Sequence, residues 1–120
     1  MMARAAAEIF IAQGHGNIVN VASTASLRGY AQGSVYSASK FALRSMSECW
    51  RAELRTHDIR VIQINPSYVP TAFGREDRVE KPEEAGKLTP VEIAHAIAGA
   101  LEMNDRGFIP ELSVFATNPF

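Results

Sequence analysis

The sequence predicts an α/β fold in which three parallel strands are interleaved with helices. A β-branched run at residues 18–22 is followed by a long helical pattern at 34–56 and by a second β-branched run at 59–64. A strand, a helix and a second strand form a βαβ unit, whose crossover is almost always right-handed, so we expect these two strands to be parallel. With 47% hydrophobic residues, the chain of 120 residues can also build a core.

The chain opens with an expected helix over residues 1–13, which is rich in alanine and is followed by the stop signal Gly14. A turn at 14–17 leads into the first strand. Residues 1–14 lack the basic end and the long apolar region of a signal peptide. We therefore expect no leader and a chain that starts inside a fold, with one edge of the first strand left for a strand that precedes residue 1.

The long helix is expected to begin after a glycine-containing loop at 27–33, with Ser34 as its N-cap. Tyr36 and Lys40 lie four residues apart near its start, so their side chains project from the same face. The second strand should end at Asn65-Pro66, because proline cannot donate a hydrogen bond to the ladder.

Residues 66–88 are polar and irregular, and their charged stretch at 75–84 predicts a mobile surface segment, for which a lid is one interpretation. A helix start signal follows at Thr89-Pro90-Val91-Glu92, where the glutamate can reach back to the capping threonine. This helix should run to about Met103. A last strand over 108–115 should lie at an edge of the sheet because it contains Pro110.

Composition narrows the classes of partner and compartment. The formal net charge of −1, from 12 basic and 13 acidic residues, gives no field of one sign that would attract nucleic acid or an anionic membrane. No apolar run approaches the roughly 20 residues of a membrane span. The single cysteine, Cys49, cannot form an internal disulfide and favours a reducing, cytoplasmic compartment. We expect Cys49 and Trp50 to be core or subunit-contact residues.

Two other kinds of site are disfavoured. The three histidines His15, His57 and His95 have no cysteine or second histidine at ligand spacing, so we expect surface residues and no metal site. Hydrolase chemistry is disfavoured because no histidine with an orienting acid accompanies the serines Ser26, Ser34, Ser37 and Ser39.

Three polar positions are expected to meet at one rim of the sheet. Ser23 follows the first strand, Asn65-Pro66 closes the second, and Tyr36 and Lys40 lie at the start of the helix between them. Open α/β sheets bind ligands beyond the carboxyl ends of their strands. The Tyr36 and Lys40 spacing alone also fits a solvated helix face, and only its combination with the other positions indicates a functional site.

Three stretches closely resemble the classical short-chain dehydrogenase/reductase family in order, spacing and context: Asn20-Val21-Ala22-Ser23, Tyr36-Ser37-Ala38-Ser39-Lys40 and Asn65-Pro66-Ser67-Tyr68-Val69-Pro70-Thr71. The resemblance covers nearly the whole chain and implies a partial Rossmann-type, doubly wound fold. Residues 1–120 would be its carboxy-terminal catalytic half. The glycine-rich phosphate loop, the residue that separates NAD from NADP and the family's catalytic asparagine would then lie upstream of Met1.

The resemblance also implies residue roles. Ser23, Tyr36 and Lys40 would be catalytic, and the cofactor, NAD or NADP, would contact Tyr36, Lys40, Pro66, Val69 and Thr71. The chemistry is consistent, because an ammonium near a phenol stabilises its phenolate form and the serine hydroxyl can bond the substrate oxygen as charge develops there. Ser67 departs from the family's usual glycine, so the backbone must accept a side chain at this position. Tyr30 and Tyr68 either line the substrate pocket or only pack.

Two functions remain open. In the first, the chain is part of a longer NAD(P)-dependent oxidoreductase that transfers a hydride to or from a small-molecule carbonyl or secondary alcohol. In the second, it is a truncated, non-catalytic fragment that acts, if at all, through association. In the family, helices matching 1–13 and 34–56 pack against their copies, so a homo-oligomer, a dimer or tetramer, is expected. The ending at 109–114 resembles the pteridine and hydroxy-acid branches more than the acyl-carrier branch.

Overall fold

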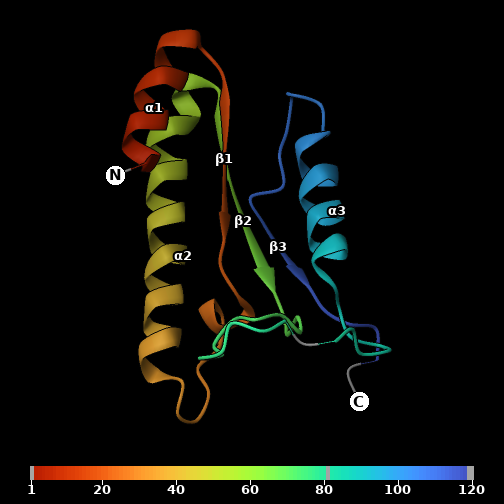
Figure 1. Ribbon diagram of the computed structural model, residues 1–120. Helices are drawn as coiled ribbons and strands as arrows, with labels where there is room; N and C mark the ends of the chain where they lie inside the picture. The colour runs from red at the N-terminus through yellow and green to blue at the C-terminus, as the bar shows by residue number, and fades with distance from the viewer. Residues whose placement is uncertain (1, 81, 119–120) are drawn as a thin grey trace.

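The computed structural model describes residues 2–80 and 82–118. Its helices are α1 (Met2–Gln13), α2 (Ser34–Leu54) and α3 (Pro90–Leu101), and its strands are β1 (Gly16–Val21), β2 (Ile59–Pro66) and β3 (Glu111–Val114) (Figure 1). Single 3₁₀ turns follow β1 at Thr24–Ser26 and α2 at Arg55–His57.

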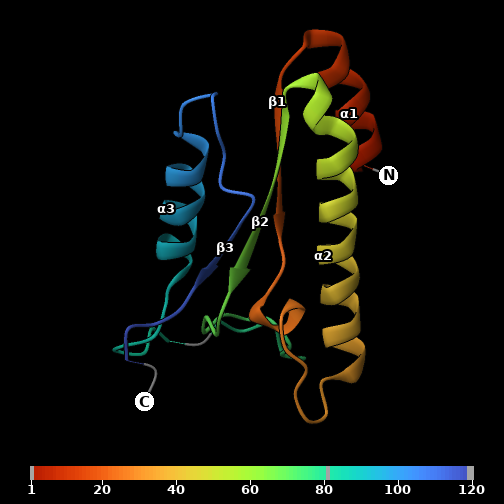
Figure 2. The ribbon, with the colours of Figure 1, turned by 180° about the vertical axis from the view of Figure 1, so that it is seen from behind.

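The three strands form one parallel sheet in the order β1-β2-β3, which confirms the predicted fold class. Gly16 pairs with Ile59 at one end of the β1 and β2 ladder, and Gln63 pairs with Glu111 where β3 begins. Helices α1 and α2 cover one face of the sheet and α3 covers the other (Figures 1 and 2). Both faces of the central strand are therefore buried, as parallel sheets require.

Strand β2 supplies the core to both layers because its side chains alternate between the two faces. Ile62 and Ile64, both 0% exposed, pack in the cluster that includes Ile93 of α3. Ile59 and Val61 pack in the cluster that includes Phe10 of α1. Burial of each such side chain contributes about 1.5–3 kcal/mol, so β2 anchors both helical layers.

Several predicted boundaries shift. Strand β1 begins at Gly16 rather than Ile18, because Gly16 already pairs with Ile59 and lies so close under the Phe10 ring that a Cβ would overlap it. Strand β2 extends through Pro66, which pairs with Val114. The prediction of Ser34 as N-cap was wrong: Gly33 holds that position, and its carbonyl accepts the first helical bond, from the Ser37 N–H at 2.8 Å.

The second half of the chain follows the predicted order. Thr89 and Glu92 form the predicted capping box at the start of α3, and this helix ends at Leu101, two residues before Met103. The described residues between Pro66 and Thr89, which are 67–80 and 82–88, contain no helix or strand. Strand β3 is shorter than predicted and lies at an edge of the described sheet, as Pro110 indicated.

Cys49 is exposed and is not a core residue of this chain, so only its alternative expectation as a subunit-contact residue stays a prediction, whereas Trp50 packs partly buried against the Ile18 cluster. The three histidines are exposed, as predicted. Within residues 2–80 and 82–118, no helix combines the length and apolarity needed to cross a membrane.

Candidate active site

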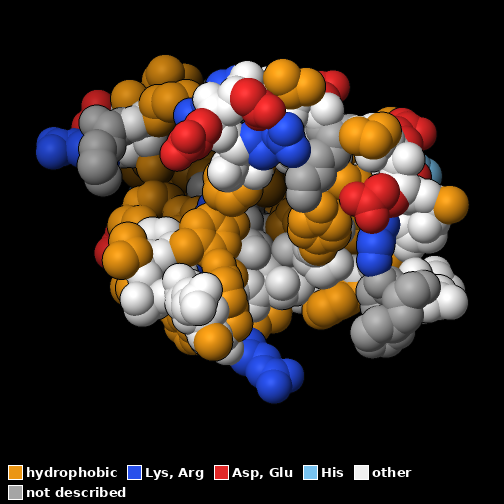
Figure 3. Space-filling model, turned by 60° about the horizontal axis from the view of Figure 1, so that its bottom comes forward, with side chains coloured by type: hydrophobic (Ala, Val, Ile, Leu, Met, Phe, Trp, Pro, Cys, Tyr) orange, Lys and Arg blue, Asp and Glu red, His pale blue; other side chains and the backbone are white. Residues whose placement is uncertain are grey.

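A cleft of about 1020 Å³ opens at the carboxyl ends of β1 and β2, between α2 and α3. Figure 3 views the molecule from this end and shows hydrophobic side chains gathered around a hollow. Four segments line the cleft: residues 21–30, the first turns of α2, residues 66–73, and α3. This is the position at which open α/β sheets bind ligands.

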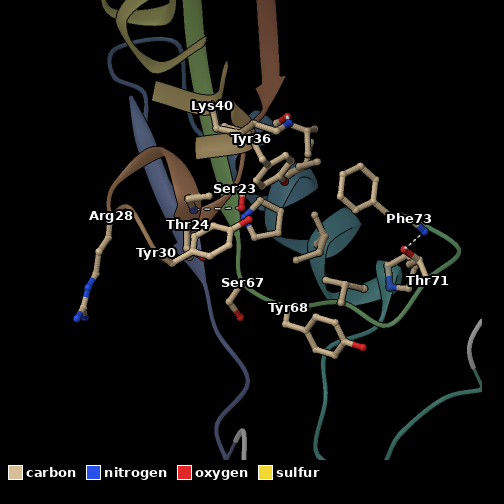
Figure 4. Close-up of a pocket in the computed structure, with 18 of the residues that line it drawn as sticks. Ser23, Thr24, Arg28, Tyr30, Tyr36, Lys40, Ser67, Tyr68, Thr71 and Phe73 are labelled. Atoms are coloured by element: carbon tan, nitrogen blue, oxygen red, sulfur yellow. Dashed lines mark hydrogen bonds between the residues drawn. The ribbon is translucent and has the colours of Figure 1, made fainter. Parts of the chain in front are cut away.

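Ser23 lies at the rim and is the N-cap of the 3₁₀ turn that follows β1. Its Oγ accepts a hydrogen bond from the Ala25 N–H at 3.1 Å, which fixes the side chain toward this turn. Among the described residues, no hydrogen bond uses the hydroxyl proton of Ser23. The Ser23 side chain can therefore donate to an oxygen atom in the cleft (Figure 4).

Tyr36 and Lys40 face the cleft from the first turns of α2, as their spacing predicted. The Lys40 Nζ lies 5.7 Å from the centroid of the Tyr36 ring and donates to the Val21 carbonyl at 3.4 Å. Within the described part of the chain, the Tyr36 hydroxyl has no hydrogen-bond partner. Figure 4 shows Tyr36, Lys40 and Ser23 on the same side of the cleft. A phenol, an ammonium and a hydroxyl therefore converge on one space.

The predicted cofactor-binding residues Pro66, Val69 and Thr71 all line the same cleft. The Thr71 Oγ1 accepts from the Phe73 N–H at 3.2 Å, which holds this part of the segment in a turn. Ser67 has no positive φ, so the position that is usually glycine accepts a side chain without backbone strain.

These residues and their order in the fold agree with one family. The sequence profile described as short chain dehydrogenase matches residues 1–82. The chain belongs to the short-chain dehydrogenase family.

The relatives of this family member include dehydrogenases and a reductase. An NADP-dependent 3-hydroxy acid dehydrogenase of Schizosaccharomyces pombe is 33% identical, and the match covers 98% of this chain and 48% of that protein. A human 3-oxoacyl-[acyl-carrier-protein] reductase is 36% identical over 82% of this chain and 44% of that protein. The closed form of a serine dehydrogenase complexed with NADP+ superposes with a TM-score of 0.82, at 29% identity, over 94% of this chain and 49% of that structure. The chain spans about half the length of these relatives.

Sequence reasoning left the roles of Tyr30 and Tyr68 open, and in this short-chain dehydrogenase both line the cleft. Both side chains are about half exposed, and Tyr30 also packs against Gly33. Arg28 is the other charged residue of this lining besides Lys40, and Figure 4 shows its side chain directed away from Tyr36. Among the described residues, no group of three or more His, Cys, Asp or Glu side chains is arranged to hold a metal ion.

Sequence reasoning missed a buried polar cluster beneath the rim. It consists of the buried Ser26, Gln63 and Asn65 and the partly buried Glu111 and Arg44, which are linked by side-chain hydrogen bonds. The sequence pattern that could have indicated this cluster is the alternation of Gln63 and Asn65 with Ile62 and Ile64 along β2. On the face of β2 that packs under α2, the side chains change from apolar to polar as the strand approaches the cleft.

Proposed function

We propose that the full-length protein is an NAD(P)-dependent oxidoreductase acting on a small-molecule carbonyl or secondary alcohol, with residues 1–120 as the carboxy-terminal catalytic half of its Rossmann domain. The observation that carries this proposal is the convergence of Ser23, Tyr36 and Lys40 in one cleft. The family and the relatives named above support the reaction class.

The cleft offers apolar surface and hydrogen-bond donors of the kind that a nicotinamide riboside needs. Pro66 and Val69 offer apolar surface, Thr71 offers a hydroxyl, and Lys40 has ammonium protons left after its bond to the Val21 carbonyl. These residues, with Tyr36, would hold the nicotinamide half of NAD or NADP. When bound, this cofactor supplies or accepts the hydride.

The chain's own side chains account for the proton. In the reductive direction, the Tyr36 hydroxyl donates its proton to the substrate carbonyl oxygen, because no described residue occupies that hydroxyl. The Ser23 hydroxyl hydrogen-bonds the same oxygen as negative charge develops on it. Lys40 stabilises the phenolate that remains on Tyr36 by its positive charge. The oxidative direction reverses each step.

The test is oxidation of NADPH or NADH by the purified full-length protein, with 3-oxo acids, sugars and pteridines as separate substrates. We expect turnover with at least one of these carbonyl compounds. The Lys40→Met variant should lose about 10²-fold or more of kcat/KM, because it loses both a cofactor contact and the charge that stabilises the phenolate. Turnover that survives this substitution unchanged, or no nicotinamide binding by the wild type, would reject the proposal.

We further propose a cytoplasmic homo-oligomer. The exposed thiol of Cys49 is consistent with a reducing compartment. Large apolar side chains are exposed on α1 and α2, including Ile9 and Val35, the latter at 84%. Light scattering of the native protein should give a dimer or tetramer, and a monomer would reject this arrangement.

Intact mass from the native source tests the proposal that residues 1–120 are half of a longer chain, since the mass should be about twice the 13.1 kDa of these residues.

A further inference from the structure

The hydroxyl of Ser26 is buried directly beneath the expected catalytic serine. Ser26 is 0% exposed, and its Oγ lies 2.7 Å from the Ser23 carbonyl oxygen and 2.9 Å from the Asn65 Oδ1, so one hydroxyl proton serves two acceptors. Neither Ser26 nor Asn65 lines the cleft. The Ser26 side chain therefore contacts the backbone that carries Ser23, and the Asn65 side chain contacts Ser26; neither reaches the cleft.

Asn65 connects this contact to two other elements. Its Oδ1 accepts from the Gln63 Nε2 at 2.8 Å, and its Nδ2 donates to the Glu111 Oε1 at 2.7 Å. The Glu111 carboxylate also receives the Arg44 guanidinium at 3.2 Å. Arg44 lies one helical turn beyond Lys40 on α2. The bonds thus run from the Ser23 loop through β2 and β3 to the helix that carries the other expected catalytic residues.

These hydrogen bonds restrict the positions of the residues that form the rim of the cleft. Buried hydrogen bonds in low dielectric are stronger than exposed ones. The Ser26 hydroxyl and both polar atoms of the Asn65 amide are hydrogen-bonded, whereas the Gln63 Oε1 is buried without a partner among the described residues. Ser26 and Asn65 are therefore the members whose positions these bonds fix. A misplacement of about 1 Å at a reacting group can cost about 10²-fold in rate. Asn65 also precedes Pro66, so the same side chain ties the Ser23 loop to the start of the expected nicotinamide-binding segment.

We infer that Ser26 and Asn65 are positioning residues, which hold Ser23 in register with Pro66 and with the start of α2. This inference rests on the proposed function. It adds that a side-chain hydrogen bond between the 3₁₀ turn after β1 and the end of β2, across 39 residues of sequence, sets the geometry of the rim. The Ser26 hydroxyl acts through Ser23 and touches no reacting atom.

The chain offers a matched control in a second hydrogen-bonded pair of serine and asparagine, in which the serine is buried and the asparagine partly buried. Ser47 is also 0% exposed, its hydroxyl donates to the Leu43 carbonyl at 2.8 Å, and it accepts from the Asn20 Nδ2 at 2.9 Å. Ser47 does not line the cleft. Ser47→Ala therefore removes the same atom and the same kinds of bond as Ser26→Ala at a site remote from the rim.

In the full-length protein, Ser26→Ala should lower kcat about tenfold with KM changed less than about twofold. Ser47→Ala should lower Tm by a similar amount but leave kcat within about twofold of wild type. In a Ser23→Ala background, Ser26→Ala should have no further effect on kcat, because a positioning residue acts only through the group that it positions. Equal kcat losses from Ser26→Ala and Ser47→Ala, or additive losses with Ser23→Ala, would overturn the inference.

A second readout does not require activity. The Ala25 N–H is protected by its bond to the Ser23 Oγ, and its hydrogen exchange should accelerate up to about tenfold in Ser26→Ala and not in Ser47→Ala. Unchanged exchange would overturn the positioning role even if kcat falls. Accelerated exchange in Ser26→Ala, together with a wild type that shows no turnover, would instead reject the proposed function alone. If Ser26→Ala does not fold, Ser26→Cys keeps the side-chain shape with a weaker donor and is expected to give the same changes in smaller measure.

Discussion

The cleft has two walls that are built differently. One wall carries Ser23, Tyr36 and Lys40 on the end of β1 and on α2, and the buried polar cluster supports it from below. The other wall consists of residues 66–73, which contain no regular element beyond Pro66, and its Phe73 is 71% exposed. The comparison indicates that the expected proton-transfer groups lie on the supported wall, whereas the exposed part of the other wall, which also carries the expected nicotinamide-binding residues, is suited to select the substrate.

One contact joins the two walls. The Tyr36 and Phe73 rings lie 5.7 Å apart between centroids at a tilt of 54°. This geometry is favourable for aromatic pairs and is worth about 0.5–1.5 kcal/mol beyond the area buried. The Phe73 ring on the exposed wall can therefore influence the position of the Tyr36 ring without taking part in the proton transfer.

The largest expected difference between the walls is in kcat. Tyr36→Phe should lower kcat about 10²–10⁴-fold, because it removes the proton that the substrate oxygen receives. Tyr68→Phe removes the same atom from the exposed wall and should lower kcat less than tenfold. Steady-state kinetics of both variants check this. Similar losses of kcat in the two variants would contradict the division of roles.

A core substitution should weaken both walls together. Ile64→Ala deletes a side chain that is 0% exposed at the centre of the α3 cluster, and should lower the free energy of unfolding by about 2–5 kcal/mol. Val91→Ala, on the exposed side of α3, should change it by less than about 0.5 kcal/mol. Urea unfolding measures both values. A small effect at Ile64 would mean that β2 does not anchor the layer behind the cleft.

Substrate selection should depend on the exposed wall. Phe73→Ala should raise KM for the carbonyl substrate about tenfold or more, with a much smaller change in kcat, because it removes apolar contact area. Val79→Ala, in the same irregular segment but outside the cleft lining, serves as the control. A fall in kcat as large as that of Tyr36→Phe, with KM unchanged, would assign Phe73 to the catalytic geometry instead.

The smallest effect concerns the helix start that follows the exposed wall. Hydrogen bonds from the Thr89 side chain and backbone hold the pKa of Glu92 below its ordinary value of 4.5. A lowered folded-state pKa stabilises the fold above the unfolded-state value, and this contribution is lost as pH falls through the lowered pKa. Glu92→Gln should therefore reduce the loss of stability on going from neutral pH to below 4.5.

Urea midpoints at neutral and acid pH measure this effect. Glu53→Gln, at an exposed side chain of α2 with no hydrogen bond among the described residues, provides the comparison. The Glu92 account fails if both substitutions leave the pH dependence equally unchanged.

The supported wall could be predicted in part from sequence. The shared helix face of Tyr36 and Lys40 follows from their spacing, and the position of Ser23 follows from the β-branched run before it, because these signals are local. Their catalytic roles rest on the family resemblance and stay predictions. The Ser26 and Asn65 contact could not be predicted, since it depends on which face of β2 each residue takes and on a pairing across 39 residues. The prediction of Ser34 as N-cap was wrong because it assumed a side-chain hydrogen bond at the helix start. Gly33 holds this position with its backbone carbonyl alone and makes no side-chain cap bond.

The central claim is that Tyr36 on the supported wall completes a hydride transfer in this cleft. The most direct measurement uses NADPH or NADH deuterated at the transferred position of the nicotinamide, with the full-length wild type and Tyr36→Phe, and mass spectrometry of the alcohol product. We predict deuterium on the carbinol carbon with the wild type and a yield lower by about 10²-fold or more with the variant. Equal yields from both proteins, or no deuterium in the wild-type product, would contradict the account.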